Sequence, residues 1–158
     1  RGFYYVMTAL SFERMFCIAP YRRLFDEILE YVKETKRDGK ALSQDPIVRQ
    51  KLAEIAIELE VTRMLYYQLA YLIDKGEVPD YQSAMQKMFA TETCQHVSRT
   101  GMEVMGLYGQ LKEDSKRVAI KGKVENYYRW SVVETIYAGT SEIMRNIIAT
   151  RGLGLPVH

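Results

Sequence analysis

The feature that most constrains the fold is the segment of residues 47–75, which lies between Pro46 and Gly76 and contains neither glycine nor proline. Aspartate is a favourable N-cap residue, and proline fits the first position of a helix because an N–H group there has no helical partner. Apolar residues then recur at helical spacing; they are Ile47, Leu52, Ile55, Leu59, Tyr66, Leu69 and Ile73. The sequence therefore predicts a helix from Asp45 to about Asp74 with one face to bury.

Glycine and proline divide the rest of the chain into further helical segments. The predicted helices cover about Phe3–Lys36, Asp80 to Gly106 or Gly109, Val124–Ile136 and Thr140–Arg151. Pro20 is expected to kink or restart the first of these, because it lacks an N–H group. Gly39 is interpreted as a stop signal after a basic helix end. In the helix capped by Asp80, the apolar positions are Met85, Met88, Phe89, Val97, Val104 and Met105.

No stretch alternates apolar and polar residues for long enough to predict a strand. Helices of roughly 28 to 34 residues are about 40 to 50 Å long, and antiparallel packing is the simplest way to bury their apolar faces. The predicted fold class is all-α, an up-and-down helical bundle of about four long helices plus a short C-terminal helix. We expect residues 1–158 to form one domain, and the opening Arg1-Gly2-Phe3 suggests a piece of a longer chain.

Composition argues against several function classes. The 22 Lys and Arg residues against 20 Asp and Glu leave a charge of +2, without the basic excess that nucleic-acid binding needs. No apolar run approaches the roughly 18 to 20 residues of a membrane span. Cys17 and Cys94 lie far apart, and His96 and His158 are the only histidines, so we expect no metal site and no disulfide framework. A reducing, cytoplasmic compartment is the expectation.

Glu13 is the most informative charged residue. The neighbours one helical turn away cannot pair with a carboxylate; they are Ala9, Leu10, Phe16 and Cys17. Such a carboxylate is exposed at the margin of an apolar surface, bonded to a group elsewhere in the fold, or desolvated with a raised pKa, as a general base requires. The adjacent Arg14 also has mostly apolar neighbours, and either extends its charge into water from a packing edge or lies beside a site.

Small residues precede the last predicted helix. Ala138 and Gly139 allow a tight turn and the close approach of a ligand, and Thr140 begins a helix whose free N–H groups favour an anion. The same residues also suit an ordinary helix start, with Thr140 as the N-cap and Glu142 complementing the helix dipole. The GxxG run at 106–109 is better explained as a helix stop than as a ligand loop.

The run from Ile136 to Ala149, IYAGTSEIMRNIIA, resembles the C-terminal signature of acyl-CoA dehydrogenases. Leu10–Arg14 resembles the start of the C-terminal helical domain of that family, and Lys51–Glu54 with Glu58–Glu60 resembles its next helix. The similarity extends over essentially the whole chain. It implies a flavoenzyme with an N-terminal helical domain, a middle β-domain and this bundle. Such an enzyme binds FAD, removes the α-proton of an acyl-CoA and passes the β-hydrogen as hydride to flavin N5.

The resemblance also implies roles for individual residues. Most members carry the catalytic glutamate at the position that is Ala138 here, whereas branches similar to isovaleryl-CoA and long-chain acyl-CoA dehydrogenases carry it at the position of Glu13. Glu13 is thereby implied as the α-proton base. The main-chain N–H of Ala138 is implied to donate to the thioester carbonyl, and Arg14 to orient the site.

For the cofactor, the resemblance implies four positions that contact FAD; these are Thr140, Glu142, Glu103 and Leu107. The family's Arg-x-x-Phe-Gly, which reaches the FAD of a neighbouring subunit, appears here as Thr35–Gly39, and Arg37 is the candidate replacement cation, two residues out of register. Pro46 stands where the family has a glutamine, and Glu103 and Leu107 replace a glutamine and a glycine. These departures suggest a divergent branch.

The implied partners are an acyl-CoA substrate, electron-transferring flavoprotein and further subunits of a homo- or hetero-oligomer, a dimer or tetramer. Two other interpretations stay open: a non-catalytic helical subunit that completes a partner chain's FAD site, and a bundle with no flavin role. This chain alone is expected to be inactive and to bind FAD weakly, because most of the flavin pocket belongs to other domains.

Overall fold

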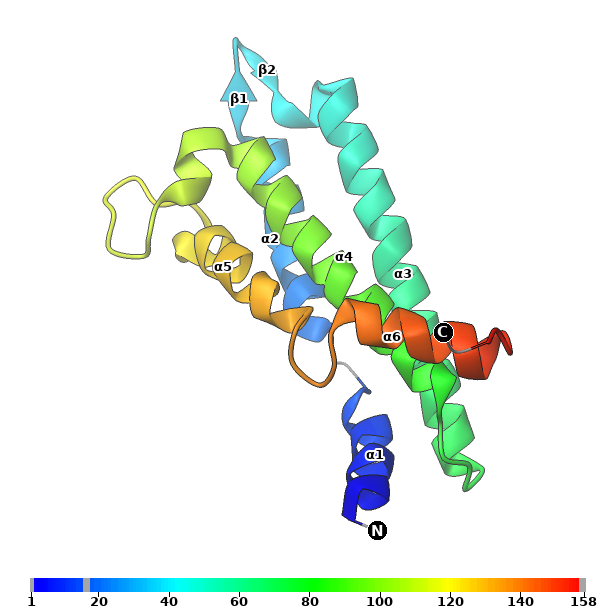
Figure 1. Ribbon diagram of the computed structural model, residues 1–158. Helices are drawn as coiled ribbons and strands as arrows, with labels where there is room; N and C mark the ends of the chain where they lie inside the picture. The colour runs from blue at the N-terminus through cyan, green and yellow to red at the C-terminus, as the bar shows by residue number, and fades with distance from the viewer. Residues whose placement is uncertain (1, 16–17, 157–158) are drawn as a thin grey trace.

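Helices form almost the whole of the computed structural model, which describes residues 2–15 and 18–156 (Figure 1). Four helices make up its body; they are α2 (Ala19–Glu34), α3 (Pro46–Asp74), α4 (Tyr81–Met105) and α5 (Lys123–Glu134). Two further helices flank this body; they are α1 (Gly2–Glu13) and α6 (Ser141–Ile147), the latter continued by a π-helical turn, η4 (Ile148–Gly152). The predicted all-α bundle is confirmed. Cys17 and His158 lie outside the described residues.

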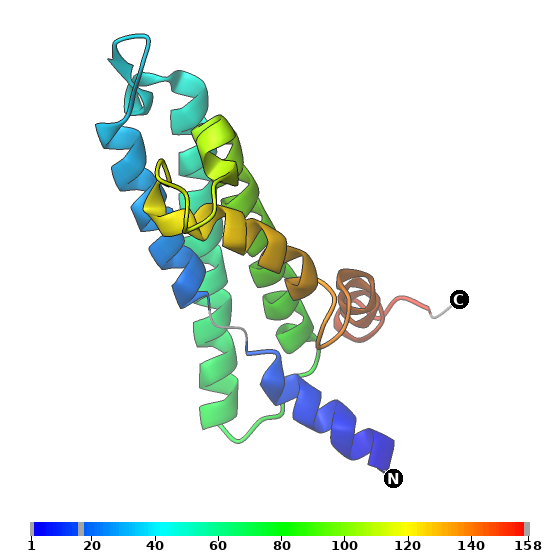
Figure 2. The same cartoon turned by 90° about the vertical axis from the view of Figure 1, so that its left-hand side faces the viewer.

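Helix α4 is the centre of the bundle, since it packs against α1, α2, α3, α5 and α6. Helices α2, α3 and α4 run side by side, and α5 lies across them (Figures 1 and 2). The core between these helices includes Ile28, Ile55, Leu59, Val97 and Val124, each at most 1% exposed. Among the described residues, none of the helices is both long enough and apolar enough to cross a membrane.

A glycine allows α4 to approach its neighbours closely. A Cβ atom at Gly101 would lie 2.9 Å from Ile28 Cδ1 and 3.0 Å from Val124 Cγ1. Small residues recur along the buried face of α4 and form a small-residue stripe; it includes Ala84, Ala90, Thr91, Cys94, Ser98 and Gly101. Of the apolar residues named for this helix, Val97, Val104 and Met105 are buried, whereas Met85, Met88 and Phe89 are only partly buried. Met88 packs against a small second core cluster of Ala84, Met144 and Ile147.

The start of α3 agrees with its sequence signals. Asp45 Oδ1 accepts hydrogen bonds from Ile47 N (2.8 Å) and Val48 N (3.3 Å), and Pro46 is the first residue of the helix. At α4 the expected cap differs, because Asp80 stands at the N-cap position without capping. Its carboxylate accepts a hydrogen bond from Arg151 Nη1 instead, at 2.7 Å.

The first predicted helix is divided in two. Helix α1 ends at Glu13, and α2 begins at Ala19 with Pro20 in its first turn, where a proline leaves no helical acceptor unpaired. Pro20 therefore restarts the helix, which is one of the two outcomes expected for it. Helix α2 then ends at Glu34, so that of the basic residues predicted at its end, Lys33 lies in the last turn and Lys36 and Arg37 follow the helix.

A small hairpin follows α2 where the sequence predicted only a helix stop. Strands β1 (Lys36–Arg37) and β2 (Lys40–Ala41) pair antiparallel, with Arg37 opposite Lys40. Asp38 (φ 52°) and Gly39 (φ 80°) form the connecting turn, and Asp-Gly is a strong hairpin signal. The prediction missed these strands because each has only two residues, too short for any alternation. Three 3₁₀ turns complete the chain; they are η1 (Leu42–Gln44), η2 (Gly106–Gln110) and η3 (Ile120–Gly122).

Candidate active site

The turn between α5 and α6 has an unusual backbone. Ala138 has φ 53° and Gly139 has φ 104°, so both residues lie in the left-handed region that side chains disfavour. A Cβ atom at Gly139 would lie 2.6 Å from Met144 Cε, so any other residue there would have to displace the end of the Met144 side chain and also adopt a strained φ. Thr140 then caps α6, because its Oγ1 accepts a hydrogen bond from Ile143 N at 3.4 Å. The ordinary N-cap role proposed for Thr140 is thus present.

Arg14 connects the end of α1 to this turn. Its side chain is only 4% exposed, and its Nε donates a hydrogen bond to the carbonyl oxygen of Ala138 at 3.1 Å. Burial, together with the charge of Arg151, lowers the pKa of Arg14. The alternative of a packing-edge arginine with its charge in water does not describe this residue. Arg14 instead joins two segments that are 124 positions apart in the sequence.

Glu13, the last residue of α1, is exposed. Its charge nevertheless acts on a residue of the turn. Burial and a hydrogen bond with Glu134 are the main causes that raise the pKa of Tyr137, and the negative charge of Glu13 acts in the same direction. Of the alternatives for Glu13, exposure at the margin describes this chain. Desolvation of its carboxylate would require atoms that the described residues do not supply.

Lys87 on α4 is the second cation at the turn, and the sequence analysis did not identify it. Its side chain is completely buried, and Nζ donates to the carbonyl oxygen of Gly139 at 2.7 Å. Nζ also lies 5.8 Å from the centre of the Tyr137 ring. Burial lowers the pKa of Lys87, and the charge of Arg14 lowers it further. Lys87 lies three residues after Ala84 and four before Thr91, so the helical spacing places it on the same face as these small residues.

A buried carboxylate supports the turn from the bundle side. Glu134, at the end of α5, is 4% exposed and accepts hydrogen bonds from Tyr137 Oη (2.7 Å) and Tyr21 Oη (3.2 Å). Burial is the main cause that raises the pKa of Tyr21, and the Glu134 charge adds to it. Both phenols therefore stay protonated at neutral pH and can donate to Glu134. The bond from Tyr137 fixes the position of its side chain at the start of the turn.

The main-chain N–H groups of the turn remain available to a ligand. Within residues 2–15 and 18–156, the N–H groups of Ala138, Gly139 and Thr140 donate to no acceptor. The turn is closed by the next amide, because Ser141 N donates to Thr135 O at 3.1 Å. Two carbonyl oxygens of the turn thus bind buried cations, while the three consecutive N–H groups have no acceptor in the described part of the chain. Such a group of donors suits an oxyanion or a polarised carbonyl.

The remaining predicted cofactor residues divide between the two ends of α4. Glu142 lies beside Thr140 at the turn, where hydrogen bonds from its own main-chain N–H and from Thr140 lower its pKa. Arg37, Glu103 and Leu107 lie at the other end, because residues 87 and 103 are separated by about 24 Å at the rise of an α-helix. The structure therefore brings Glu142 and Thr140 together at the turn that Arg14 contacts, and separates the other three from them.

At this far end the side chains are already paired within the chain. Glu103 forms an ion pair with Lys51, and Arg37 Nη2 donates to the carbonyl oxygen of Val104 at 3.1 Å. Leu107 is 80% exposed. Arg37 is exposed and carries a charge that suits a pyrophosphate, whereas the charge of Lys51 is offset by its ion pair with Glu103. Glu103 is held by Lys51 and contributes a negative charge there.

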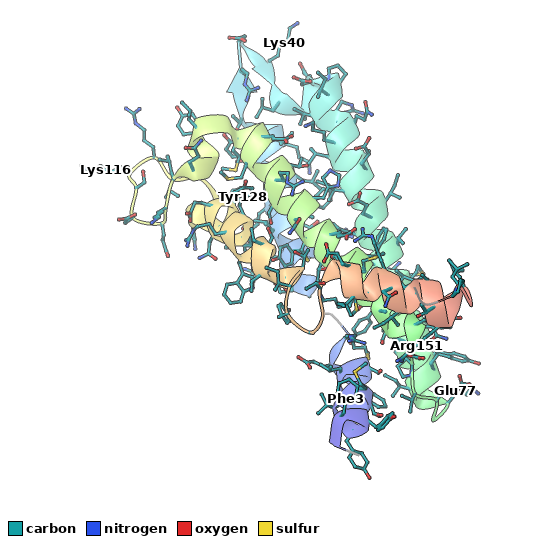
Figure 3. All side chains as sticks on the ribbon, in the orientation of Figure 1. Phe3, Lys40, Glu77, Lys116, Tyr128 and Arg151 are labelled. Atoms are coloured by element: carbon teal, nitrogen blue, oxygen red, sulfur yellow. The ribbon has the colours of Figure 1, made fainter. Side chains whose placement is uncertain are left out.

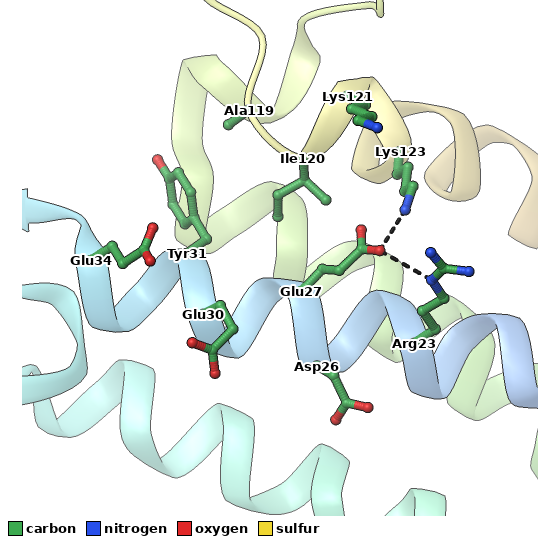
Figure 4. Close-up of a pocket in the computed structure, with 10 residues that line it drawn as sticks. All are labelled: Arg23, Asp26, Glu27, Glu30, Tyr31, Glu34, Ala119, Ile120, Lys121 and Lys123. Carbon is green, nitrogen blue, oxygen red and sulfur yellow. Dashed lines mark hydrogen bonds and ion pairs between the residues drawn. The ribbon is translucent and has the colours of Figure 1, made fainter.

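A separate pocket of about 680 Å³ lies between α2 and the η3 turn (Figure 4). Glu27 Oε1 forms ion pairs there with Lys123 Nζ at 2.5 Å and Arg23 Nε at 3.3 Å. The pocket contains none of the predicted site residues, and both signs of charge line it. Nothing in this arrangement selects a ligand, and the turn before α6 remains the candidate site.

Comparison with known proteins places the chain in a family. Residues 1–153 match the family model described as acyl-CoA dehydrogenase, C-terminal domain. The chain therefore belongs to the acyl-CoA dehydrogenase family of flavoprotein oxidoreductases, and the predicted resemblance is confirmed.

Curated relatives and solved structures agree with this assignment. The chain is 32% identical to the caffeyl-CoA reductase-Etf complex subunit CarC of Acetobacterium woodii, over 78% of this chain and 31% of that protein. It is 32% identical to acyl-CoA dehydrogenase FadE26 of Mycobacterium tuberculosis, over 98% of this chain and 40% of that protein. The solved ChsE4–ChsE5 complex of M. tuberculosis is similar with a TM-score of 0.83 and 30% identity, over 90% of this chain and 36% of that chain. The chain thus spans less than half the length of these relatives.

Proposed function

We propose that residues 1–158 are the C-terminal helical domain of an FAD-dependent acyl-CoA dehydrogenase in which Glu13 is the α-proton base. The observation that carries this proposal is the contact between Arg14 Nε and the Ala138 carbonyl oxygen at 3.1 Å. That contact ties the end of α1, where Glu13 lies, to the turn whose N–H groups are free. In this proposal the contact holds the acid and the oxyanion donors in a fixed relation to each other.

The proposed chemistry needs two groups from this chain. The Glu13 carboxylate takes the α-proton of the thioester, and the Ala138 N–H donates to the thioester carbonyl as negative charge develops on its oxygen. Arg14 contributes by holding Ala138, and its position next to Glu13 keeps the two groups in register. FAD, when bound, supplies the acceptor for the β-hydrogen as hydride.

Glu13 also needs an apolar environment in order to act near neutral pH. Helix α1 favours such a covered position for Glu13, because Phe3, Tyr4, Tyr5 and Val6 are each more than half exposed. Figure 3 shows the side chains of α1, with Phe3 labelled. We propose that the other domains of the longer protein cover this face. The acyl-CoA then lies between those domains and the turn.

FAD is proposed to contact both ends of α4. Thr140 and Glu142 would hold it at the turn. Arg37, with Glu103 and Leu107, would hold the FAD of a neighbouring subunit, since their distance from the turn suits a second cofactor. This arrangement requires an oligomer, a dimer or tetramer, and it accounts for exposed side chains of α5 such as Trp130 (59%) and Val132 (55%).

Electron-transferring flavoprotein is the proposed redox partner, in keeping with the name of the relative from Acetobacterium woodii. That relative is named as a reductase, so the direction of the reaction depends on the partner. In the reductive direction the same Glu13 would return a proton to the α-carbon. A cytoplasmic location remains a prediction.

The alternative proposal is a non-catalytic helical subunit that completes the FAD site of a partner chain. Two observations favour keeping it: Glu13 is exposed in this chain, and one of the similar solved structures is a complex of two different chains, ChsE4 and ChsE5. In this case the base would belong to the partner.

Replacement of Glu13 by Gln in the full-length protein separates the two proposals. Gln keeps the shape and removes the base, so we expect the rate of acyl-CoA-dependent flavin bleaching to fall by about 10²- to 10⁴-fold. The flavin content should not change. Glu30→Gln, on the exposed face of α2, is the matched control and should retain the full rate. An undiminished rate in Glu13→Gln would contradict a catalytic role and favour the non-catalytic subunit.

A further inference from the structure

We propose that Lys87 is a positioning residue that holds the free N–H donors of the turn in place, an inference that rests on the proposed function for its catalytic consequence. Lys87 binds the turn through the Gly139 carbonyl oxygen, at 2.7 Å from Nζ. Arg14 binds the preceding carbonyl oxygen, that of Ala138. Two consecutive peptide groups are thus each held by a buried cation.

The geometry of the peptide group transmits this anchoring to the donors. A peptide group is planar and trans, so its N–H points away from its carbonyl oxygen. Arg14 therefore orients the N–H of Gly139, and Lys87 orients the N–H of Thr140. Both N–H groups point away from the cations, and neither donates to an acceptor within the described part of the chain.

Lys87 also contacts Tyr137, the residue that precedes Ala138. Its Nζ lies over the ring of Tyr137, 5.8 Å from the ring centre, and the phenol of Tyr137 is held by Glu134. The peptide group that carries the Ala138 N–H follows Tyr137 directly. Lys87 thus contacts the residues on both sides of Ala138, the residue whose N–H is proposed to bind the thioester.

Burial makes a purely structural role a weak explanation for Lys87. A completely buried ammonium group loses its hydration, and an apolar residue of similar volume is often as good for stability or better. The nearby Arg14 adds repulsion between two cations. What the lysine provides, and an apolar residue cannot, is a charged donor to a carbonyl oxygen, which also polarises the peptide group and strengthens its N–H as a donor.

The test compares three variants of the full-length flavoprotein. Lys87→Met removes the charge and the donor with little change of volume, and Lys87→Arg restores both. Val97→Ala, further along α4 in the core, is the control for loss of stability alone. Two quantities are measured: hydrogen exchange of the Ser141 amide, which closes the turn on Thr135 O, and the separate kcat and KM for acyl-CoA.

In Lys87→Met we expect at least tenfold faster exchange at Ser141, together with a kcat lowered about 10²-fold and a KM within a few-fold of wild type. Lys87→Arg should recover most of both. Val97→Ala should raise exchange along α4 and leave kcat unchanged.

Unchanged exchange at Ser141 in Lys87→Met overturns the anchoring role. Faster exchange with an unchanged kcat overturns the catalytic consequence. Exchange responds to the anchor even if the wild-type protein does not turn over any acyl-CoA. Faster exchange at Ser141 in Lys87→Met, in a protein whose wild type does not turn over acyl-CoA, supports the anchoring role and counts against the proposed function. Failure of the anchoring role and failure of the proposed function are therefore distinguishable.

Discussion

At the scale of single residues, main-chain atoms form the candidate site and charged side chains hold it. In the turn before α6, Arg14 and Lys87 donate hydrogen bonds to the carbonyl oxygens of Ala138 and Gly139. The N–H groups of the same peptide groups point away from these cations. The left-handed conformation of Ala138 costs about 1 kcal/mol or more for a residue with a Cβ atom. Such strain persists only where the surroundings fix the backbone, and the two buried cations provide that fixation.

Gly139→Ala tests how tightly the turn is packed. We expect a loss of about 2 to 4 kcal/mol in the free energy of unfolding, since the new methyl group combines a disfavoured φ with a 2.6 Å contact to Met144 Cε. The matched control is Gly76→Ala, where φ is 78° and no atom lies within 4 Å, so only the backbone cost applies. Urea unfolding measures both. Equal losses at the two positions would show that contact with Met144 adds nothing.

At the scale of helices and strands, local signals account for most of the boundaries. Asp45 and Pro46 mark the start of α3, and Gly106 follows the last residue of α4. Pro20 restarts a helix because proline is tolerated in a first turn. The small β1–β2 hairpin had its own local signal in Asp38-Gly39, but two-residue strands have no periodicity by which to find them.

Asp45→Ala should destabilise the domain by about 1 kcal/mol, because Ile47 N and Val48 N lose their acceptor at the start of α3. Asp45→Asn retains an oxygen acceptor without the charge, and we expect it to lose much less. The free energy of unfolding in urea distinguishes them. If Asn were as damaging as Ala, the effect would arise from the negative charge near the helix N-terminus and not from the cap.

Contacts between distant segments were beyond the reach of local patterns. The bond from Lys87 to Gly139 spans 52 positions and that from Arg14 to Ala138 spans 124. Arg14 and Ala138 were named as site residues through the family resemblance, which carries long-range information. Lys87 was missed because its role depends on the register of α4 against the turn, and its place in the small-residue stripe is meaningful only once that register is known.

At the scale of the whole molecule, α1 stands apart from the bundle (Figures 1 and 2). It touches the rest mainly through α4, and aromatic side chains such as Phe3 (73% exposed) and Tyr4 (75%) face solvent. The sequence predicted a bundle but not which faces would remain open, since that depends on atoms outside this chain. The exposure of Glu13 has the same origin in our proposal.

The isolated chain should be colourless after purification and should bind FAD weakly or not at all. The physical reason is that its proposed FAD residues lie in two groups about 24 Å apart along α4, with no flavin pocket enclosed between them in the described part of the chain. The amount of bound FAD is measured by the flavin absorbance at about 450 nm, after incubation with FAD and gel filtration. A stoichiometric yellow complex would contradict the expectation.

Arg14 and Lys87 bind main-chain carbonyl oxygens, which every amino acid has, and this has an evolutionary consequence. The methyl group of Ala138 takes no part in it, so that position can exchange its side chain while the loop keeps its shape. An acid could be gained or lost there in a single substitution, provided that another acid stands across from it. If Glu13 is the base as proposed, one backbone would serve proteins that carry the proton acceptor either at the position of Glu13 or at that of Ala138.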